Sequence, residues 1–248
     1  MDFFAKTDKG RKRRVNQDYV FATGQQIGAL PDLFLLADGM GGHKAGDFAS
    51  RFAVEEFKKY ISEDTSETPA IQLIQNGISS VNERLFILSQ EDENLSGMGT
   101  TFVTAFIDGN NLTVSNIGDS RAYLIHGNTI KQITRDHSYV EEMIRRGFMR
   151  RGSKEYLDSR NIITRAVGIE PHVTADFFEI EITEGDYLLM CSDGLTTMVD
   201  NESIRNIICE RSSVSDKVQA LIDIANINGG KDNIGIVLVD PFGEEVAS

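Results

Sequence analysis

Apolar side chains recur every three or four residues in several stretches, the spacing that gives an α-helix one buried face. The longest stretches carry polar residues on the opposite side, so we expect them to pack against a sheet. The predicted helices span about 44–60, 71–88, a short segment that stops at Gly147, 204–208 and 218–225.

Other stretches have the patterns of β-strands. Residues 33–37 form an unbroken apolar run, which is typical of a strand buried on both faces. From Gly99 onward, β-branched residues and Gly-Asn turns predict one antiparallel meander. Its strands are expected at 100–107, 112–117, 121–125 and 129–133, with further strands at the N-terminus, 187–192 and 234–239. Together the elements predict an α+β fold.

Composition narrows the class of protein. The chain has 248 residues, 40% hydrophobic and 25% charged, which predicts a soluble protein with a single domain over 1–248. A net charge of -13 argues against nucleic-acid partners and anionic membranes. No segment is long and apolar enough for a signal peptide or a membrane span. Cys191 and Cys209 lack metal or redox spacing, so we expect buried, reduced thiols in a cytoplasmic protein.

Aspartates at the ends of predicted strands are the main candidates for chemistry. Asp38 ends the buried run and is followed by Gly39, so the backbone can turn sharply there. Taken alone, such a pair is equally typical of an ordinary turn. Similar aspartates recur at Asp18, Asp119, Asp193 and Asp232. If they converge, they offer only oxygen ligands, which favours Mg²⁺ or Mn²⁺ over zinc and indicates a dinuclear phosphate-ester hydrolase.

Two basic stretches stand out in this acidic chain. Residues 9–14 contain five cations just before Asp18, and they form either a solvated loop or a phosphate-binding group. A second basic patch at 145–154 follows the short helix and is either solvated surface or a landing site for an acidic or phosphorylated substrate. We interpret His137, at the start of that helix, as a capping or packing residue.

The ordered motifs resemble those of a known family. They are Arg13 with Asn16-Gln17-Asp18, Ala37-Asp38-Gly39-Met40-Gly41-Gly42-His43, Gly99-Thr100-Thr101, Gly118-Asp119-Ser120-Arg121, Asp136-His137-Ser138, Ser192-Asp193-Gly194 and Gly230-Lys231-Asp232-Asn233. In this order, over about residues 5–240, they are similar to the metal-dependent serine/threonine protein phosphatases, the PPM or type 2C family, in their compact bacterial form.

The resemblance implies a four-layer αββα sandwich in which two mainly antiparallel sheets lie between helix pairs. It implies two Mn²⁺ or Mg²⁺ ions per site, a weaker third ion, and direct attack on phosphorus by a metal-bridging hydroxide. By position, Asp18, Asp38 and Asp232 would bind the first ion, and Asp38, the Gly39 carbonyl and Asp193 the second. Asp119 with Asp193 would form the third site, Arg13 would hold the substrate phosphate, and about 139–160 would be a flap.

The resemblance also implies substrates and partners. These are phosphoserine and phosphothreonine proteins, a bacterial serine/threonine kinase whose action the enzyme opposes, and a monomeric state by default. Two residues depart from the family pattern. Gln17 replaces a usual Glu, which is expected to weaken metal affinity. Met40 replaces a His proposed as general acid in eukaryotic members, so Asp119 and a nearby metal-bound water are expected to serve instead.

Three other functions fit parts of the sequence. The same chemistry could serve a dedicated phosphatase for an anti-sigma-factor antagonist. A phosphoprotein-binding module without turnover is disfavoured, because all five acidic positions are retained as Asp. A nucleic-acid phosphodiesterase is disfavoured by the charge balance.

Overall fold

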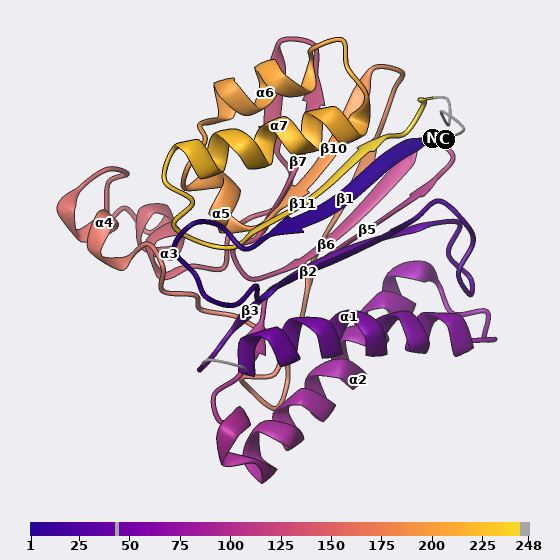
Figure 1. Cartoon of the computed structure of the whole chain (residues 1–248). Helices are drawn as coiled ribbons and strands as arrows, with labels where there is room; N and C mark the ends of the chain where they lie inside the picture. Colours follow the sequence, from indigo (N-terminus) through magenta and orange to yellow (C-terminus); the bar gives the residue numbers. More distant parts are fainter. Residues whose placement is uncertain (43–44, 244–248) are drawn as a thin grey trace.

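The computed structural model describes residues 1–42 and 45–243. It contains two β-sheets that lie face to face between two layers of helices (Figure 1). Every paired strand is antiparallel to its neighbour. The predicted α+β sandwich is therefore confirmed. His43 and Lys44, where the Gly-rich motif ends and the first helix was expected to begin, lie outside the described residues.

The first sheet has five strands in the order β1-β11-β10-β7-β8. Their bounds are Asp2–Asp8 for β1, Ile234–Asp240 for β11, Asp186–Cys191 for β10, Arg121–His126 for β7 and Thr129–Gln132 for β8. Three helices cover its outer face, namely α5 (Asp193–Thr196), α6 (Asn201–Ile208) and α7 (Val214–Ile227). The spacing of apolar residues predicts α6 and α7, and their buried residues pack in one cluster with those of β10 and β11.

The second sheet runs β2-β3-β5-β6-β9, and the short β4 pairs with the end of β3. The strands span Asp18–Thr23 (β2), Leu33–Met40 (β3), Gly99–Thr100 (β4), Phe102–Asp108 (β5), Asn111–Ile117 (β6) and Asp176–Glu181 (β9). Its outer face is covered by α1 (Ala45–Glu63) and α2 (Ala70–Glu91), and the 3-10 turn η1 (Glu93–Leu95) follows α2.

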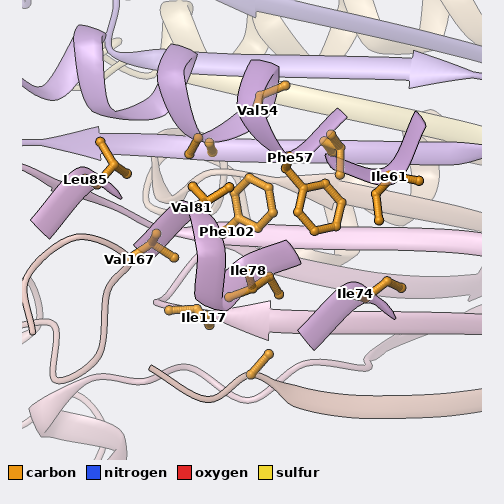
Figure 2. Packing of buried hydrophobic residues seen from close by; sticks show 14 of the residues in the cluster. Val54, Phe57, Ile61, Ile74, Ile78, Val81, Leu85, Phe102, Ile117 and Val167 are labelled. Atoms are coloured by element: carbon orange, nitrogen blue, oxygen red, sulfur yellow. The ribbon is translucent and has the colours of Figure 1, made fainter. Parts of the chain in front are cut away.

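Two apolar layers hold these elements together. Between the sheets, Phe34 and Leu36 of β3 belong to the same apolar cluster as Leu188 and Met190 of β10, and all four are fully buried. Outside the second sheet, α1 and α2 pack as shown in Figure 2, where the ring of Phe57 meets that of Phe102 edge-on at 5.2 Å. Leu33–Ala37 is accordingly buried on both faces, as its unbroken apolar run predicted.

The predicted four-stranded meander is wrong in one respect. The hairpins β5-β6 and β7-β8 form, but β6 and β7 belong to different sheets. Gly118-Asp119-Ser120 is therefore a crossover between sheets and no hairpin turn. Gly118 has a φ of 102°, and a Cβ there would lie 2.6 Å from the Thr101 side chain, so the crossover turns where only glycine fits.

Other differences are local. The pattern did not predict β9, α5 or the helix α4 (Lys154–Ser159), although the helix α3 (Tyr139–Arg145) lies where a short one was expected. Cys191 is buried as expected, but Cys209 is exposed because it caps the end of α6 and donates to the Gly127 carbonyl at 3.0 Å. No helix in the described part of the chain is long and apolar enough to cross a membrane.

Candidate active site

The five predicted aspartates gather at one end of the two sheets. Asp18 and Asp38 are directly opposite each other on β2 and β3. Asp193 follows β10 and Asp232 precedes β11 in the other sheet, whereas Asp119 lies on the crossover between the sheets. The site is thus assembled across the gap between the sheets, from segments far apart in sequence.

Close backbone approaches fix the strand ends that carry these aspartates. A Cβ at Gly39 would lie 1.9 Å from the Gly46 carbonyl oxygen, so β3 can meet the start of α1 only through glycine. Likewise, a Cβ at Gly194 would lie 1.8 Å from the Asn233 carbonyl oxygen. The Asp-Gly pairs therefore let neighbouring segments touch beside the carboxylates.

Ser192 joins the two sheets at the site. Its hydroxyl donates to Asp18 Oδ2 at 2.7 Å and accepts from the Gly235 amide at 2.8 Å. The other oxygen of this carboxylate, Asp18 Oδ1, is buried and has no hydrogen-bond partner. An unpaired buried carboxylate oxygen is costly, so this atom calls for a cation.

Burial and mutual repulsion disfavour the charged form of these carboxylates. The side chains of Asp18 and Asp119 are 5% and 8% exposed. Burial, with repulsion from Asp193, raises the pKa of each to about 7. Burial and repulsion from Asp232 raise the pKa of Asp193 to about 6, and burial with repulsion from Asp18 raises that of Asp38 well above its ordinary value. Strongly perturbed carboxylates that share one site are typical of functional centres.

The donor set fits hard divalent ions. Carboxylate and carbonyl oxygens are the ligands that Mg²⁺ and Mn²⁺ prefer, and a bound cation would relieve both the repulsion and the unpaired Asp18 oxygen. Within residues 1–42 and 45–243, no three His, Cys, Asp or Glu side chains already converge as a complete metal-binding group. Asp232 accepts a hydrogen bond from Arg13, and Asp18 accepts one from Ser192.

Arg13 supplies positive charge at the mouth of the site. Its Nη2 donates to Asp232 Oδ2 at 2.6 Å, and its side chain is half exposed. The hydrogen bond to Asp232 is the main reason that the pKa of Arg13 is raised. Of the two interpretations of the first basic stretch, the position of Arg13 favours the phosphate-binding one, because its exposed guanidinium can reach an incoming anion.

The segment from α3 to α4 forms one wall beside the carboxylates. Asp119, Asp193, Arg151, Tyr156 and Arg160 all line a cavity of about 200 Å³. Arg160 lies near enough to Asp193 to stabilise its charge. The expected flap at about 139–160 therefore adjoins the third candidate ion site.

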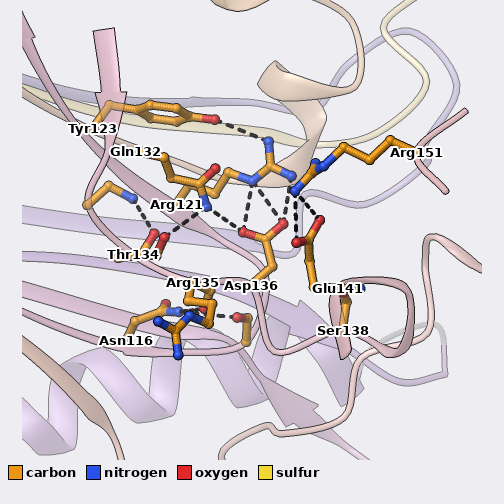
Figure 3. Close-up of polar contacts among 12 residues, drawn as sticks. Asn116, Arg121, Tyr123, Gln132, Thr134, Arg135, Asp136, Ser138, Glu141 and Arg151 are labelled. Atoms are coloured by element: carbon orange, nitrogen blue, oxygen red, sulfur yellow. Dashed lines mark hydrogen bonds and ion pairs between the residues drawn. The ribbon is translucent and has the colours of Figure 1, made fainter. Parts of the chain in front are cut away.

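A partly buried ion pair lies at the base of this wall, and the spacing of the sequence does not indicate it (Figure 3). Arg121 Nη2 donates to Asp136 Oδ2 at 2.6 Å, and its Nε contacts both oxygens at 3.0 Å. Gln132 Nε2 also donates to Asp136 Oδ1, at 2.7 Å. Burial opposes the charge of Arg121, but the hydrogen bonds to Asp136 outweigh it and raise the arginine pKa. Both residues stand in recognised motifs, but nothing in the spacing indicates that they pair.

His137 and Ser138 have structural contacts, as expected for His137. Ser138 is the N-cap of α3 and accepts from the Glu141 amide. His137 is 7% exposed and lies between Gly118 and Asp176. Burial is the main reason that its pKa is lowered.

Buried carboxylates at one end of the two sheets of an α+β sandwich, with an arginine beside them, fit a hydrolase of phosphate esters. A family model described as "Protein phosphatase 2C" matches residues 7–227. The chain therefore belongs to the protein phosphatase 2C family, which confirms the predicted family and enzyme class, a protein-serine/threonine phosphatase.

Named relatives agree with this assignment. The chain is 37% identical over 240 residues to serine/threonine phosphatase stp of Listeria welshimeri, covering 95% of this chain and 94% of that protein. It is 37% identical to protein phosphatase PhpP of Streptococcus pneumoniae, covering 96% and 97%. The crystal structure of serine/threonine phosphatase Stp1 from Staphylococcus aureus superposes with a TM-score of 0.88 at 33% identity, covering 97% of this chain and 95% of that one.

Proposed function

We propose that the protein removes phosphate from phosphoserine and phosphothreonine side chains with two Mn²⁺ or Mg²⁺ ions per site. Members of the family depend on metal ions. In this chain, the buried Asp18 Oδ1, which has no hydrogen-bond partner, is the observation that most supports metal binding. We assign Asp18, Asp38 and Asp232 to the first ion and Asp38, the Gly39 carbonyl and Asp193 to the second. Asp119 with Asp193 would hold a weaker third ion.

The bound ions would supply Lewis-acid activation of water and neutralise the charge of the phosphate. The residues of the chain supply position. Arg13 now donates to Asp232, and an Asp232 oxygen engaged by a cation would release the guanidinium to hold two phosphate oxygens. Met40 has no proton to donate. We therefore assign protonation of the leaving oxygen to solvent ordered by Asp119, and an Asp119→Asn variant with unchanged turnover and pH profile would contradict this assignment.

The remaining proposals concern the setting of the enzyme. The whole chain would act as one domain, with the segment at 139–160 as a substrate-selecting flap. A cytoplasmic, monomeric enzyme that opposes a serine/threonine kinase fits the acidic charge and the relatives named as serine/threonine phosphatases. The rival functions, service to an anti-sigma-factor antagonist or binding without turnover, have no specific support in the described contacts.

The direct test is phosphate release from a phosphothreonine peptide in Mn²⁺, Mg²⁺ or EDTA, with Asp193→Ala alongside. We expect turnover that requires the metal and falls by at least about a hundredfold in the variant, because a ligand to two of the assigned sites is lost. Asp200→Ala is the matched control, since Asp200 only caps α6. Turnover in EDTA, or full activity of Asp193→Ala, would refute the proposed mechanism.

A further inference from the structure

The backbone of Gly118, the residue before Asp119, is held by three hydrogen bonds. The Gly118 amide donates to His137 Nδ1 at 3.1 Å. The Gly118 carbonyl accepts from the His137 amide at 2.8 Å and from Asn116 Nδ2 at 3.3 Å. Both backbone polar groups of Gly118 are therefore used, and His137 contacts each of them.

The residue after Asp119 is also held. Ser120 Oγ shares a hydrogen bond of 2.8 Å with Thr101 Oγ1, which in turn accepts from the Asp38 amide at 2.9 Å. Asp119 thus lies between two residues that are held in place: Gly118 by His137 (the His137 clamp) and Ser120 by Thr101 (the Thr101 clamp). The Thr101 clamp ties Asp119 to Asp38, so a shift on the His137 side would change the distance between Asp119 and the other carboxylates.

The His137 clamp depends on one tautomer of the ring. Because Nδ1 accepts from a backbone amide, the proton of the neutral ring lies on Nε2. Nε2 donates to Asp176 Oδ2 at 3.1 Å. Asp176 is itself oriented by Arg165, whose Nη1 donates to Oδ1 at 2.8 Å. Asp176 and Arg165 therefore hold the ring of His137 in the tautomer that accepts from Gly118.

We infer that His137 is a positioning residue which fixes the backbone of Gly118 and thereby sets the affinity of the cation site at Asp119 and Asp193. The inference rests on the proposed metal-dependent function. It assigns His137 no contact with a metal or a substrate, and it gives Asp176 the role of holding the histidine tautomer. A histidine that only filled space would be replaceable by any side chain of similar volume.

Two amide substitutions separate the two nitrogens of the ring. In His137→Asn the amide oxygen falls near the place of Nδ1, so it can still accept from Gly118. In His137→Gln the amide falls near the place of Nε2, so only the contact with Asp176 survives. A matched control is His126→Asn, because His126 also pairs with an aspartate, Asp186 at 2.9 Å, but at the far end of β7.

The experiment is Mn²⁺ titration of each purified protein by calorimetry, with turnover measured against Mn²⁺ concentration in parallel. For His137→Gln we expect the weakest Mn²⁺ dissociation constant to rise about tenfold while the tighter ones stay within twofold. His137→Asn should remain within threefold of the wild type, and His126→Asn should not differ from it.

The outcomes are separable. Wild-type weak-site affinity in His137→Gln, or equal losses in both His137 variants, would overturn the role of His137 alone. A wild-type protein that binds no Mn²⁺ would overturn the proposed function as well. If the variants do not fold, the ¹⁵N shifts of the wild-type histidines still decide, because the inference requires His137 to carry its proton on Nε2 only. A proton on Nδ1 would refute it.

Discussion

At the scale of single residues, Gln17 is the main difference from the family pattern within the site. Its backbone is fixed, since its amide donates to Asn233 Oδ1 at 2.9 Å and its carbonyl accepts from the Gly39 amide at 3.0 Å. Its side chain lies against Gly46 at the start of α1, where a Cβ would come within 2.3 Å of Gln17 Nε2. A glutamate side chain at position 17 would be stabilised by the partial positive charge at the N-terminus of α1.

We expect Gln17→Glu to tighten Mn²⁺ binding roughly fivefold, about 1 kcal/mol, because it adds negative charge beside the proposed metal ligands. Calorimetric titration at pH 7.5 measures the change. Gln25→Glu is the control, since it makes the same charge change in an exposed loop. Equal effects of the two variants would show that only net charge matters.

Some residues of the candidate site can be predicted from the sequence, and others cannot. The candidate aspartates are predictable because each stands at a predicted strand edge and most have a Gly or Asn neighbour. Ser192 was part of a motif, but its bond to Asp18 joins residues 174 positions apart, which no spacing indicates. Sequence spacing likewise gives no indication that Arg121 pairs with Asp136. Contacts of this kind become visible only when the fold brings the segments together.

At the scale of elements, the segment from α3 to α4 combines positive charge with exposed apolar surface. Phe148 is 78% exposed and Leu157 is 55% exposed. Arg146 and Arg151 are paired with glutamates of α3, whereas Arg145 and Arg150 form no ion pair with any residue in the described ranges. In a chain of net charge -13, this segment is a place where an acidic phosphoprotein can approach.

We therefore expect Arg150→Glu to raise the KM for a phosphoprotein about fivefold at low salt and to leave that for a small aryl phosphate unchanged. Steady-state kinetics with both substrates measures the split. Arg211→Glu, on the exposed turn between α6 and α7, is the control. A rise in KM for the aryl phosphate would mean that the active site itself was disturbed.

Hydrophobic period identified most of the elements, because α1, α2, α6, α7 and the central strands each bury a regular face. It failed at the crossover, because Gly-Asp-Ser has the chemistry of a hairpin turn whether the chain returns to the same sheet or passes to the other. It also failed at Cys209, whose apolar neighbours in α6 are buried although the helix end is not. Local pattern determines the kind of element, whereas its partner depends on distant residues.

At the scale of the whole molecule, the buried carboxylates make stability depend on pH. Asp18 and Asp119 have a pKa of about 7 in the fold, and Asp193 about 6, mainly because of burial. Their usual unfolded pKa is about 4. A raised folded pKa means that the folded protein binds more protons, so this contribution is complete below about pH 4 and is lost as pH rises through 6 and 7.

We expect the free energy of unfolding in EDTA to fall by up to about 6 kcal/mol between pH 5 and pH 8. Saturating Mn²⁺ should stabilise the protein far more at pH 8, because metal binding requires ionised carboxylates. Urea denaturation at both pH values, with and without Mn²⁺, measures these changes. Asp193→Asn should reduce the fall in EDTA, and equal stabilisation by Mn²⁺ at both pH values would contradict the prediction.

The placement of the site across two sheets also bears on how long the protein survives. Asp18 and Asp38 belong to one sheet, and Asp193 and Asp232 border the other. An ion bound by all four would therefore cross-link the two sheets. Separation of the sheets would then require loss of the ion, which slows both unfolding and cleavage by proteases. Scarcity of manganese or magnesium would thus lower the amount of enzyme as well as its activity.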